Sequence, residues 1–212
     1  GTLTYSGGSA AQAISAAMTL DRSGSMGGAG STNDLSLEAA SISFVNNLAA
    51  TDQAAIINFS SSIAVDQTMT STKALLISAI SNESVSHSGT ALYDSMGVGV
   101  ATAETGTNAR KAVIAMTDGE ENGDSTWLLS PEAVISYATG RGIPIYTIGF
   151  GSAASGTSSG ATVLKNVATG TGGIFYSAAS TEALVALYGK ISSALSSSWT
   201  IDFTSPVTFV TG

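Results

Sequence analysis

Short apolar runs alternate along most of this chain with longer segments whose apolar residues recur at helical spacing. The runs 54–59 and 112–116 have the length and composition of buried strands. The segment 33–50 instead has a broad apolar face and begins with Asn33 and Asp34, both candidates for a helix N-cap. This alternation is typical of a parallel sheet with helices on both of its faces.

The same pattern predicts the approximate bounds of each element. We place strands near residues 14–20, 53–59, 63–69, 111–117, 143–149 and 173–177. We place helices near residues 33–50, 72–81, 90–104, 130–140, 161–169 and 180–196. The strand at 63–69 follows its predecessor too closely for a parallel crossover, so it should be an antiparallel edge. The predicted fold class is therefore α/β, a doubly wound and mostly parallel six-stranded sheet with one antiparallel edge strand.

The chain is expected to form a single domain. Its 212 residues can bury one substantial core, at about 15–197. The extensions 1–14 and 198–212 contain alternating segments that are predicted to pair as a small antiparallel ribbon. Because the chain begins abruptly, without a basic-then-apolar leader, we expect one module of a longer protein. No apolar run reaches the roughly 18 residues that a membrane-spanning helix needs.

Charged residues are scarce, and acids outnumber bases. Charged residues make up 10% of the chain, against about 25% in an average soluble protein. Ser, Thr, Gly and Ala take their place, which suits a bacterial surface protein, so we expect a secreted or cell-surface location. The net charge of -8 would repel nucleic-acid phosphates, so nucleic acid is not an expected partner. The absence of cysteine excludes thiol catalysis and thiolate metal sites.

An acid and two hydroxyls occupy alternate positions directly after the first predicted strand: Asp21, Ser23 and Ser25. These side chains can converge when the chain turns, and they offer the oxygen ligands that a hard cation prefers. Three oxygens are too few for magnesium or calcium, so other loops must contribute. The candidates are Thr90, at a predicted helix start, and Asp118, after a predicted strand. In an open α/β sheet, ligands bind beyond the carboxyl ends of the strands, where such loops meet.

At these three places the chain resembles a von Willebrand factor type A domain. The metal-ion-dependent adhesion site of that family is written D-x-S-x-S, then T, then D, and all five positions are matched in order by Asp21, Ser23, Ser25, Thr90 and Asp118. The resemblance extends over roughly residues 15–197 and includes the segments 54–62, 89–96, 110–122, 142–151 and 164–176. It implies the Rossmann-like fold of that family and a bound divalent cation. Magnesium is the first expectation, with calcium or manganese as alternatives.

The resemblance also implies a mode of partner binding. Family members often leave one coordination position of the cation open, and a carboxylate from an Asp or Glu of a partner protein can fill it. A glycan hydroxyl is a weaker candidate. The leading hypothesis is a cation-dependent adhesion module of a larger bacterial surface adhesin, monomeric as an isolated domain. The alternatives are an intracellular partner-binding domain that assists an ATPase or chelatase complex, and a structural spacer with a vestigial site.

Five further residues are candidates for a rim that contacts the ligand: Arg22, Met26, His87, Glu120 and Glu121. For Arg22 an equal alternative is an ion pair with a nearby carboxylate. For His87 the safer interpretation is a solvated loop residue. The acidic residues, together with Asp124, are more simply explained by a solvated acidic loop.

Motifs of enzymatic chemistry are incomplete in this sequence. The segment 149–154 fits G-x-G-x-x-A, but no acid that could hold a ribose follows before Glu182. The loop that begins at Asp118 has Leu129 where a calcium-binding EF-hand has its bidentate Glu. No Walker motif occurs, and a Ser-His-Asp hydrolase would have to recruit His87, the single histidine. We therefore expect a binding module and not an enzyme.

Overall fold

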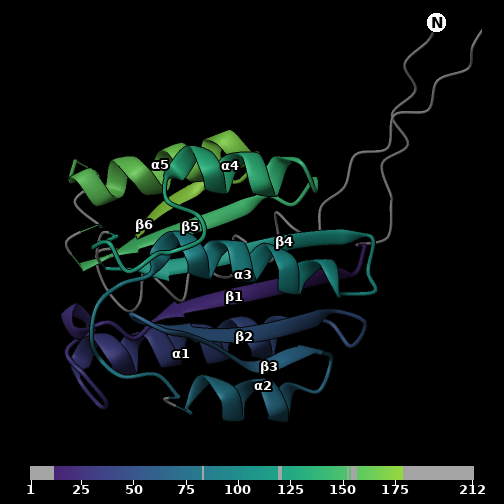
Figure 1. Ribbon diagram of the computed structural model, residues 1–212. Coiled ribbons are helices and arrows are strands. Elements are labelled where there is room, and N and C mark those ends of the chain that lie inside the picture. The colour runs from purple at the N-terminus through teal and green to yellow at the C-terminus, as the bar shows by residue number, and fades with distance from the viewer. Residues whose placement is uncertain (1–11, 83, 119–120, 152, 154–156, 179–212) are drawn as a thin grey trace, which may run out of the picture.

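A six-stranded sheet lies at the centre of the protein. The computed structural model describes residues 12–82, 84–118, 121–151, 153 and 157–178. The strands are β1 (Ile14–Asp21), β2 (Gln53–Phe59), β3 (Ile63–Thr70), β4 (Arg110–Thr117), β5 (Ile145–Phe150) and β6 (Phe175–Ala178). Their order is β3-β2-β1-β4-β5-β6, and β3 alone is antiparallel to its neighbour (Figure 1).

Helices cover both faces of this sheet, and each face has its own apolar core. The helices are α1 (Thr32–Asn47), α2 (Lys73–Ile80), α3 (Leu92–Glu104), α4 (Pro131–Thr139) and α5 (Ser159–Thr171), with a short 3-10 turn η1 (Gly24–Met26) after β1. One core packs α1 and α2 against the sheet, and the other packs α3, α4 and α5. We call these the α1–α2 face and the α3–α5 face.

The central strand β1 is buried along its whole length because both of its faces are covered. Its side chains alternate between the faces with a period of two. Met18 and Leu20 belong to the core of the α1–α2 face, whereas Ala17 belongs to the core of the α3–α5 face. By this alternation Asp21 falls on the α3–α5 face.

Serine residues begin three of the helices in the same way. Ser31, Ser130 and Ser158 each accept a hydrogen bond from the amide three residues on, at 3.3, 3.3 and 3.1 Å. This satisfies one of the amides that a helix start leaves without an intrahelical partner. The serine content of the chain thus serves helix initiation as well as the surface.

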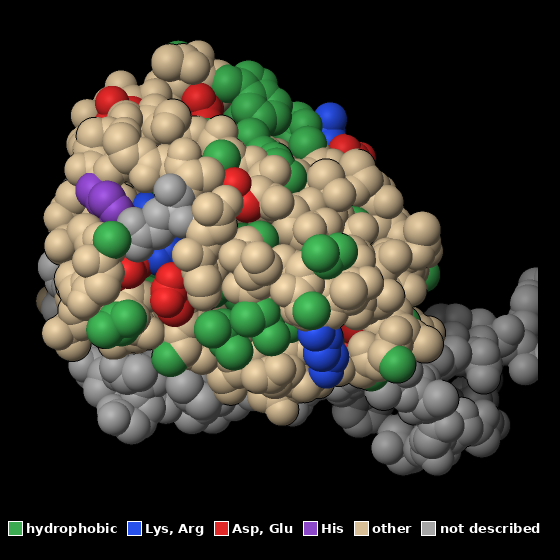
Figure 2. All heavy atoms as spheres, turned by 90° about the horizontal axis from the view of Figure 1, so that it is seen from below, with side chains coloured by type: hydrophobic (Ala, Val, Ile, Leu, Met, Phe, Trp, Pro, Cys, Tyr) green, Lys and Arg blue, Asp and Glu red, His purple; other side chains and the backbone are tan. Residues whose placement is uncertain are grey.

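The surface carries few charged side chains. On the face shown in Figure 2, most atoms belong to backbone or to uncharged polar side chains, and the red and blue areas are small. Among the described residues, no helix combines the length and the apolar character needed to cross a bilayer.

The structure confirms the predicted fold class, including the antiparallel edge strand. β1, β2, β3 and β4 agree with their predicted bounds within one residue, whereas β5 and β6 begin two residues later than predicted. The helix predicted for 33–50 ends at Asn47 because Leu48 adopts an extended backbone. The helix predicted for 180–196 and the terminal ribbon lie outside the described residues, and the single-domain organisation stays a prediction.

Candidate metal centre

The predicted ligand loops meet at the carboxyl ends of β1 and β4. These two strands pair in parallel, with Leu20 opposite Met116, so the residues that follow them emerge at the same edge of the sheet. The strand order reverses between them, since β2 follows on one side and β5 on the other. This is where open α/β sheets bind their ligands.

Asp21 is fully buried at this edge. One of its carboxylate oxygens, Oδ1, accepts a hydrogen bond from the amide of Ser23 at 2.7 Å, and the hydroxyl of Thr117 donates to the other. Burial nevertheless raises the pKa of Asp21 from 3.8 to about 6, and the nearby charge of Asp118 adds to this rise. The environment therefore disfavours the ionised carboxylate, and a cation beside it would offset that cost.

A chain of short oxygen contacts leads from this loop to the end of β4. The hydroxyls of Ser23 and Ser25 lie 2.9 Å apart, and the Ser25 hydroxyl donates to Oδ1 of Asp118 at 2.7 Å. Burial also raises the pKa of Asp118. The turn η1 produces this geometry, because it folds the chain back directly after Ser23 and is closed by Gly27 at a φ of 88°. Side chains 93 residues apart in the sequence are thereby brought into contact.

Thr90 is held at the same edge by its backbone. Its amide donates to Oδ1 of Asn122 at 3.0 Å and to Oδ2 of Asp124 at 2.8 Å, and its side chain is largely buried. The preceding segment is joined to the first loop, since the amide of Gly24 donates to the carbonyl of Ser88 at 2.9 Å. The loops that carry Ser25, Thr90 and Asp118 are therefore linked pairwise.

Gly89 is required by this arrangement. A Cβ at position 89 would lie 1.7 Å from Oδ2 of Asp124, the atom that accepts the Thr90 amide. No side chain can be placed there unless Asp124 gives up its position. The small residue thus allows the Asp118 loop to approach Thr90.

The available ligands restrict the type of cation. Within the described parts of the chain, no three or more His, Asp and Glu side chains gather as a potential metal cluster. A site at this edge would consist of two carboxylates supplemented by hydroxyls, all of them oxygen donors. Such a set fits magnesium, calcium or manganese better than it fits zinc or copper. The residues present are chemically suited to the cation that the family resemblance implies.

The rim prediction is wrong for Arg22, which is fully buried. Its side chain donates from Nε to Oδ1 of Asn58 at 3.0 Å, from Nη1 to the Asp34 carboxylate and from Nη2 to the carbonyl of Ile80. The ion pair with a carboxylate, which was the alternative, is the arrangement observed. Arg22 has the same parity as Leu20, and this directs its side chain to the α1–α2 face.

The prediction also fails for Met26, which is 1% exposed and belongs to the apolar core of the α1–α2 face. Glu121 is half-buried, so its side chain is not a freely solvated acid, and its contact with a ligand stays a prediction. Its carboxylate accepts hydrogen bonds from the amides of Tyr93, Gly123 and Ser125 and from the Ser125 hydroxyl. It therefore organises the loop that follows Asp118.

For two further residues predicted to form the rim, ligand contact stays a prediction. His87, the single histidine and the purple side chain in Figure 2, is half-buried near the loop of Thr90. A role for it in ligand contact stays a prediction. Glu120 lies outside the described residues.

Sequence reasoning missed three residues that shape the site. Asn122 and Asp124 accept hydrogen bonds from the Thr90 amide, so Asp124 is not simply part of a solvated acidic loop. Asp94, in the first turn of α3, accepts hydrogen bonds from the amides of Thr126, Trp127 and Leu128. These carboxylates and the amide bind backbone groups more than 30 residues away in the chain. A backbone amide has no sequence signature, so such partners cannot be inferred from the pattern.

Comparison with protein families gives one match that covers most of the chain. The model of the von Willebrand factor type A domain family matches residues 17–190. No protein of curated function matches the sequence.

Solved structures share the fold at low sequence identity. BatB, a conserved hypothetical protein from Bacteroides thetaiotaomicron, aligns with a TM-score of 0.70 and 19% identity over 87% of this chain and 100% of its own. The vWF domain of the type V pili tip protein Mfa5 from Porphyromonas gingivalis gives 0.65 and 14% over 88% of this chain and 96% of its own. The PilB minor pilin from Streptococcus sanguinis gives 0.67 and 17% over 87% of this chain and 61% of its own.

Proposed function

The chain belongs to the von Willebrand factor type A domain family, and we propose on this premise that its linked loops bind a divalent cation through which the domain binds a partner protein. The ligands are the five residues of the family motif: Asp21, Ser23, Ser25, Thr90 and Asp118. The observation that carries the proposal is the contact chain from Ser23 through Ser25 to Asp118, which gathers oxygens from two strand ends. The hydrogen bond from the Ser23 amide to Oδ1 of Asp21 adds Asp21 to the same cluster.

Each residue has a distinct part in holding the ion. Asp21 and Asp118 supply negative charge from a buried position, where an opposite charge acts over a low local dielectric. The hydroxyls of Ser23, Ser25 and Thr90 supply neutral oxygens. Two carboxylates balance the formal charge of a divalent cation but fill only part of its coordination shell, so a further oxygen ligand such as a carboxylate can bind. When bound, the cation supplies positive charge and an exchangeable coordination position.

The site has an open side from which a partner can reach it. Ser25 is exposed, whereas Asp21, Ser23, Thr90 and Asp118 are buried. A carboxylate from an Asp or Glu of a partner would approach past Ser25 and complete the coordination shell. Magnesium is the expected ion because few of the ligands are charged and the site is compact; calcium and manganese are the alternatives.

The cellular setting belongs to the same proposal. Two of the similar structures come from a pilus tip protein and a minor pilin, which supports a role as a non-enzymatic adhesion module on a bacterial surface. The scarcity of charged residues supports the same location.

Cation titration tests the proposal directly. The chelator-treated protein is titrated with magnesium, calcium and manganese by calorimetry, and its melting temperature is recorded with and without each ion. Asp118→Asn should abolish the heat and the rise in melting temperature. Glu104→Gln is the matched control, because it removes an equal charge from an exposed ion pair distant from the site. If none of the three ions gives heat or a thermal shift with the wild-type protein, the proposal is wrong.

A further inference from the structure

Arg22 stands between two proposed ligands in the sequence, but its side chain lies on the other face of the sheet. Asp21 and Ser23 belong to the oxygen cluster, whereas the Arg22 side chain has no exposed surface and enters the core between α1 and α2. A fully buried guanidinium is costly unless its donors are satisfied. Its contacts therefore carry information about what the residue does.

The guanidinium is held from three directions. Its Nε donates to Asn58 of β2 at 3.0 Å, its Nη1 pairs with Asp34 of α1, and its Nη2 donates to the carbonyl of Ile80, the last residue of α2. Its backbone amide also donates to the carbonyl of Phe59 at 2.7 Å. A planar fork satisfied in three directions has little freedom to turn.

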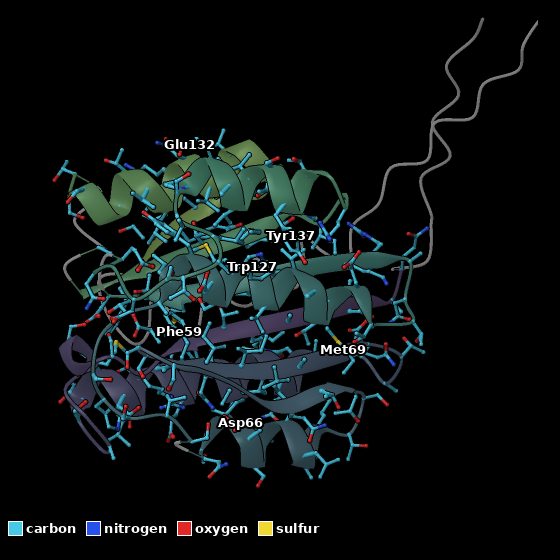
Figure 3. All side chains as sticks on the ribbon, in the orientation of Figure 1. Phe59, Asp66, Met69, Trp127, Glu132 and Tyr137 are labelled. Carbon is cyan, nitrogen blue, oxygen red and sulfur yellow. The ribbon has the colours of Figure 1, made fainter. Side chains whose placement is uncertain are left out.

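The partners of Arg22 are themselves fixed. The side-chain amide of Asn58 donates to Oδ2 of Asp66 at 2.6 Å and to the carbonyl of Ala79 at 3.2 Å. Asp66, labelled in Figure 3 on β3 beside α2, also accepts the hydroxyl of Ser84 at 2.6 Å. The anchor of Arg22 thus extends to the edge of the sheet.

Asp34 anchors the other end of the same loop. Its Oδ2 accepts the amide of Gly30 at 2.9 Å, and its own amide donates to the N-cap Ser31. The segment from Ser23 to Ser31 is therefore closed by the pair Arg22–Asp34, which joins its start to its end. Within this closed segment lie Ser23 and Ser25, the two hydroxyls of the proposed cation site.

We propose that Arg22 is a positioning residue for the cation site: by clamping the loop 23–31 to α1, α2 and β2, it holds the hydroxyls of Ser23 and Ser25 toward Asp118 before any ion arrives. This inference rests on the proposed function. A loop that is already ordered does not have to be ordered on binding, so the ion binds more tightly. Residues that orient metal ligands typically change metal affinity by about 10–100-fold when they are replaced.

Two variants separate positioning from simple support of the fold. Arg22→Lys keeps the charge opposite Asp34 but cannot reproduce the planar fork to Asn58 and Ile80. The pair Arg22→Met with Asp34→Asn removes both fully buried charges together, and Glu38, whose carboxylate lies 3.8 Å from Nη1, is partly exposed and stays in contact with solvent. Replacing the exposed pair by Arg141→Met with Glu104→Gln is the matched control. Folding of each variant is verified by circular dichroism before titration.

The first readout is the magnesium affinity of the folded protein, measured by calorimetry. Both Arg22 variants should bind magnesium about 10-fold or more weakly, whereas the control pair should bind like the wild type. The second readout is amide hydrogen exchange without any ion. Exchange of the Gly24 amide, which donates to the carbonyl of Ser88, should accelerate in both variants, while exchange of the Ile57 amide in β2 should not.

The outcomes distinguish this inference from the function on which it rests. If the wild type binds magnesium and the folded Arg22 variants bind it within about twofold with unchanged Gly24 exchange, Arg22 only supports the fold and the inference is wrong. If the wild type binds no divalent ion, the proposed function fails and the positioning role falls with it. Should the double variant not fold, Arg22→Lys decides the question.

Discussion

Asp21 and Arg22 are adjacent, fully buried and oppositely charged, but their surroundings differ in kind. On the α1–α2 face, Arg22 meets a carboxylate, an amide oxygen and a carbonyl, so its charge is balanced within the protein. On the α3–α5 face, Asp21 accepts hydrogen bonds from neutral donors, and burial raises its pKa to about 6. One face balances its charge with an oppositely charged protein group, whereas the other surrounds its carboxylate with neutral donors, where the proposed cation would bind.

The difference shows how a structural charge can be told from a functional one. Burial alone does not separate them, because both residues are inaccessible. What separates them is whether the neighbouring groups stabilise the charged form, and a carboxyl with a strongly raised pKa at the edge of a sheet is a candidate for a functional site. Removing each charge in turn tests this distinction between Asp21 and Arg22.

The largest effect is expected from Arg22→Met without a compensating change. This variant leaves the Asp34 carboxylate buried without its cationic partner, which should cost about 3–5 kcal/mol of the free energy of unfolding. Urea denaturation in the presence of a chelator measures it. Asp21→Asn, which removes a charge one residue away, should not destabilise the cation-free protein at neutral pH. Equal losses in the two variants would remove the distinction between the faces.

The second-largest expected effect is a dependence of the free energy of unfolding on pH, caused by the raised pKa of Asp21. Its pKa is about 6 in the folded protein and lies near 3.9 in an unfolded chain, so between these values the folded state binds more protons. The free energy of unfolding of the cation-free protein should therefore fall as pH rises from about 4 to about 6, by about 3 kcal/mol. The raised pKa of Asp118 acts in the same direction.

Denaturation at several pH values with a chelator checks this, and Asp21→Asn should flatten the profile. In excess magnesium the fall should be reduced, because the ion binds the ionised carboxylate and competes with its proton. A profile that is unchanged by Asp21→Asn would contradict the assignment to this residue.

The sequence predicts the strands and the orientation of Arg22, but it does not predict the roles of Asp94 and Glu121. Apolar runs predicted β1, β2, β4 and β5 because these strands are largely buried on both faces. The alternation along β1 also predicts the orientation of Arg22, which has the same parity as Met18 and Leu20. Because of this parity, the prediction that Arg22 lies at the rim is wrong. The roles of Asp94 and Glu121 could not be predicted, since they bind backbone amides whose positions depend on the folded loop.

A smaller effect is expected at Gly89, which connects two of the ligand loops. In Gly89→Ala the new Cβ would overlap Oδ2 of Asp124, so that carboxylate must leave the Thr90 amide. The loss of this charge-assisted hydrogen bond should destabilise the protein by about 1–3 kcal/mol and weaken magnesium binding. The φ of Gly89 is not positive, so the cost of Gly89→Ala comes from this overlap and not from backbone strain. A Gly89→Ala variant with wild-type affinity would show that Thr90 does not depend on Asp124.

The smallest effect is expected from removing one hydroxyl, that of Thr117, beside Asp21. The Thr117 hydroxyl donates to Asp21, so it stabilises the ionised carboxylate on the face where ionisation is otherwise disfavoured. Thr117→Val keeps the shape of the side chain and removes the donor, which should cost about 1 kcal/mol above the pKa of Asp21 and less below it. Denaturation of wild type and variant at both ends of this pH range measures the difference. An equal cost at both ends would mean that Thr117 supports packing and not the charge of Asp21, and the neutral donors would then have no part in preparing this face for an ion.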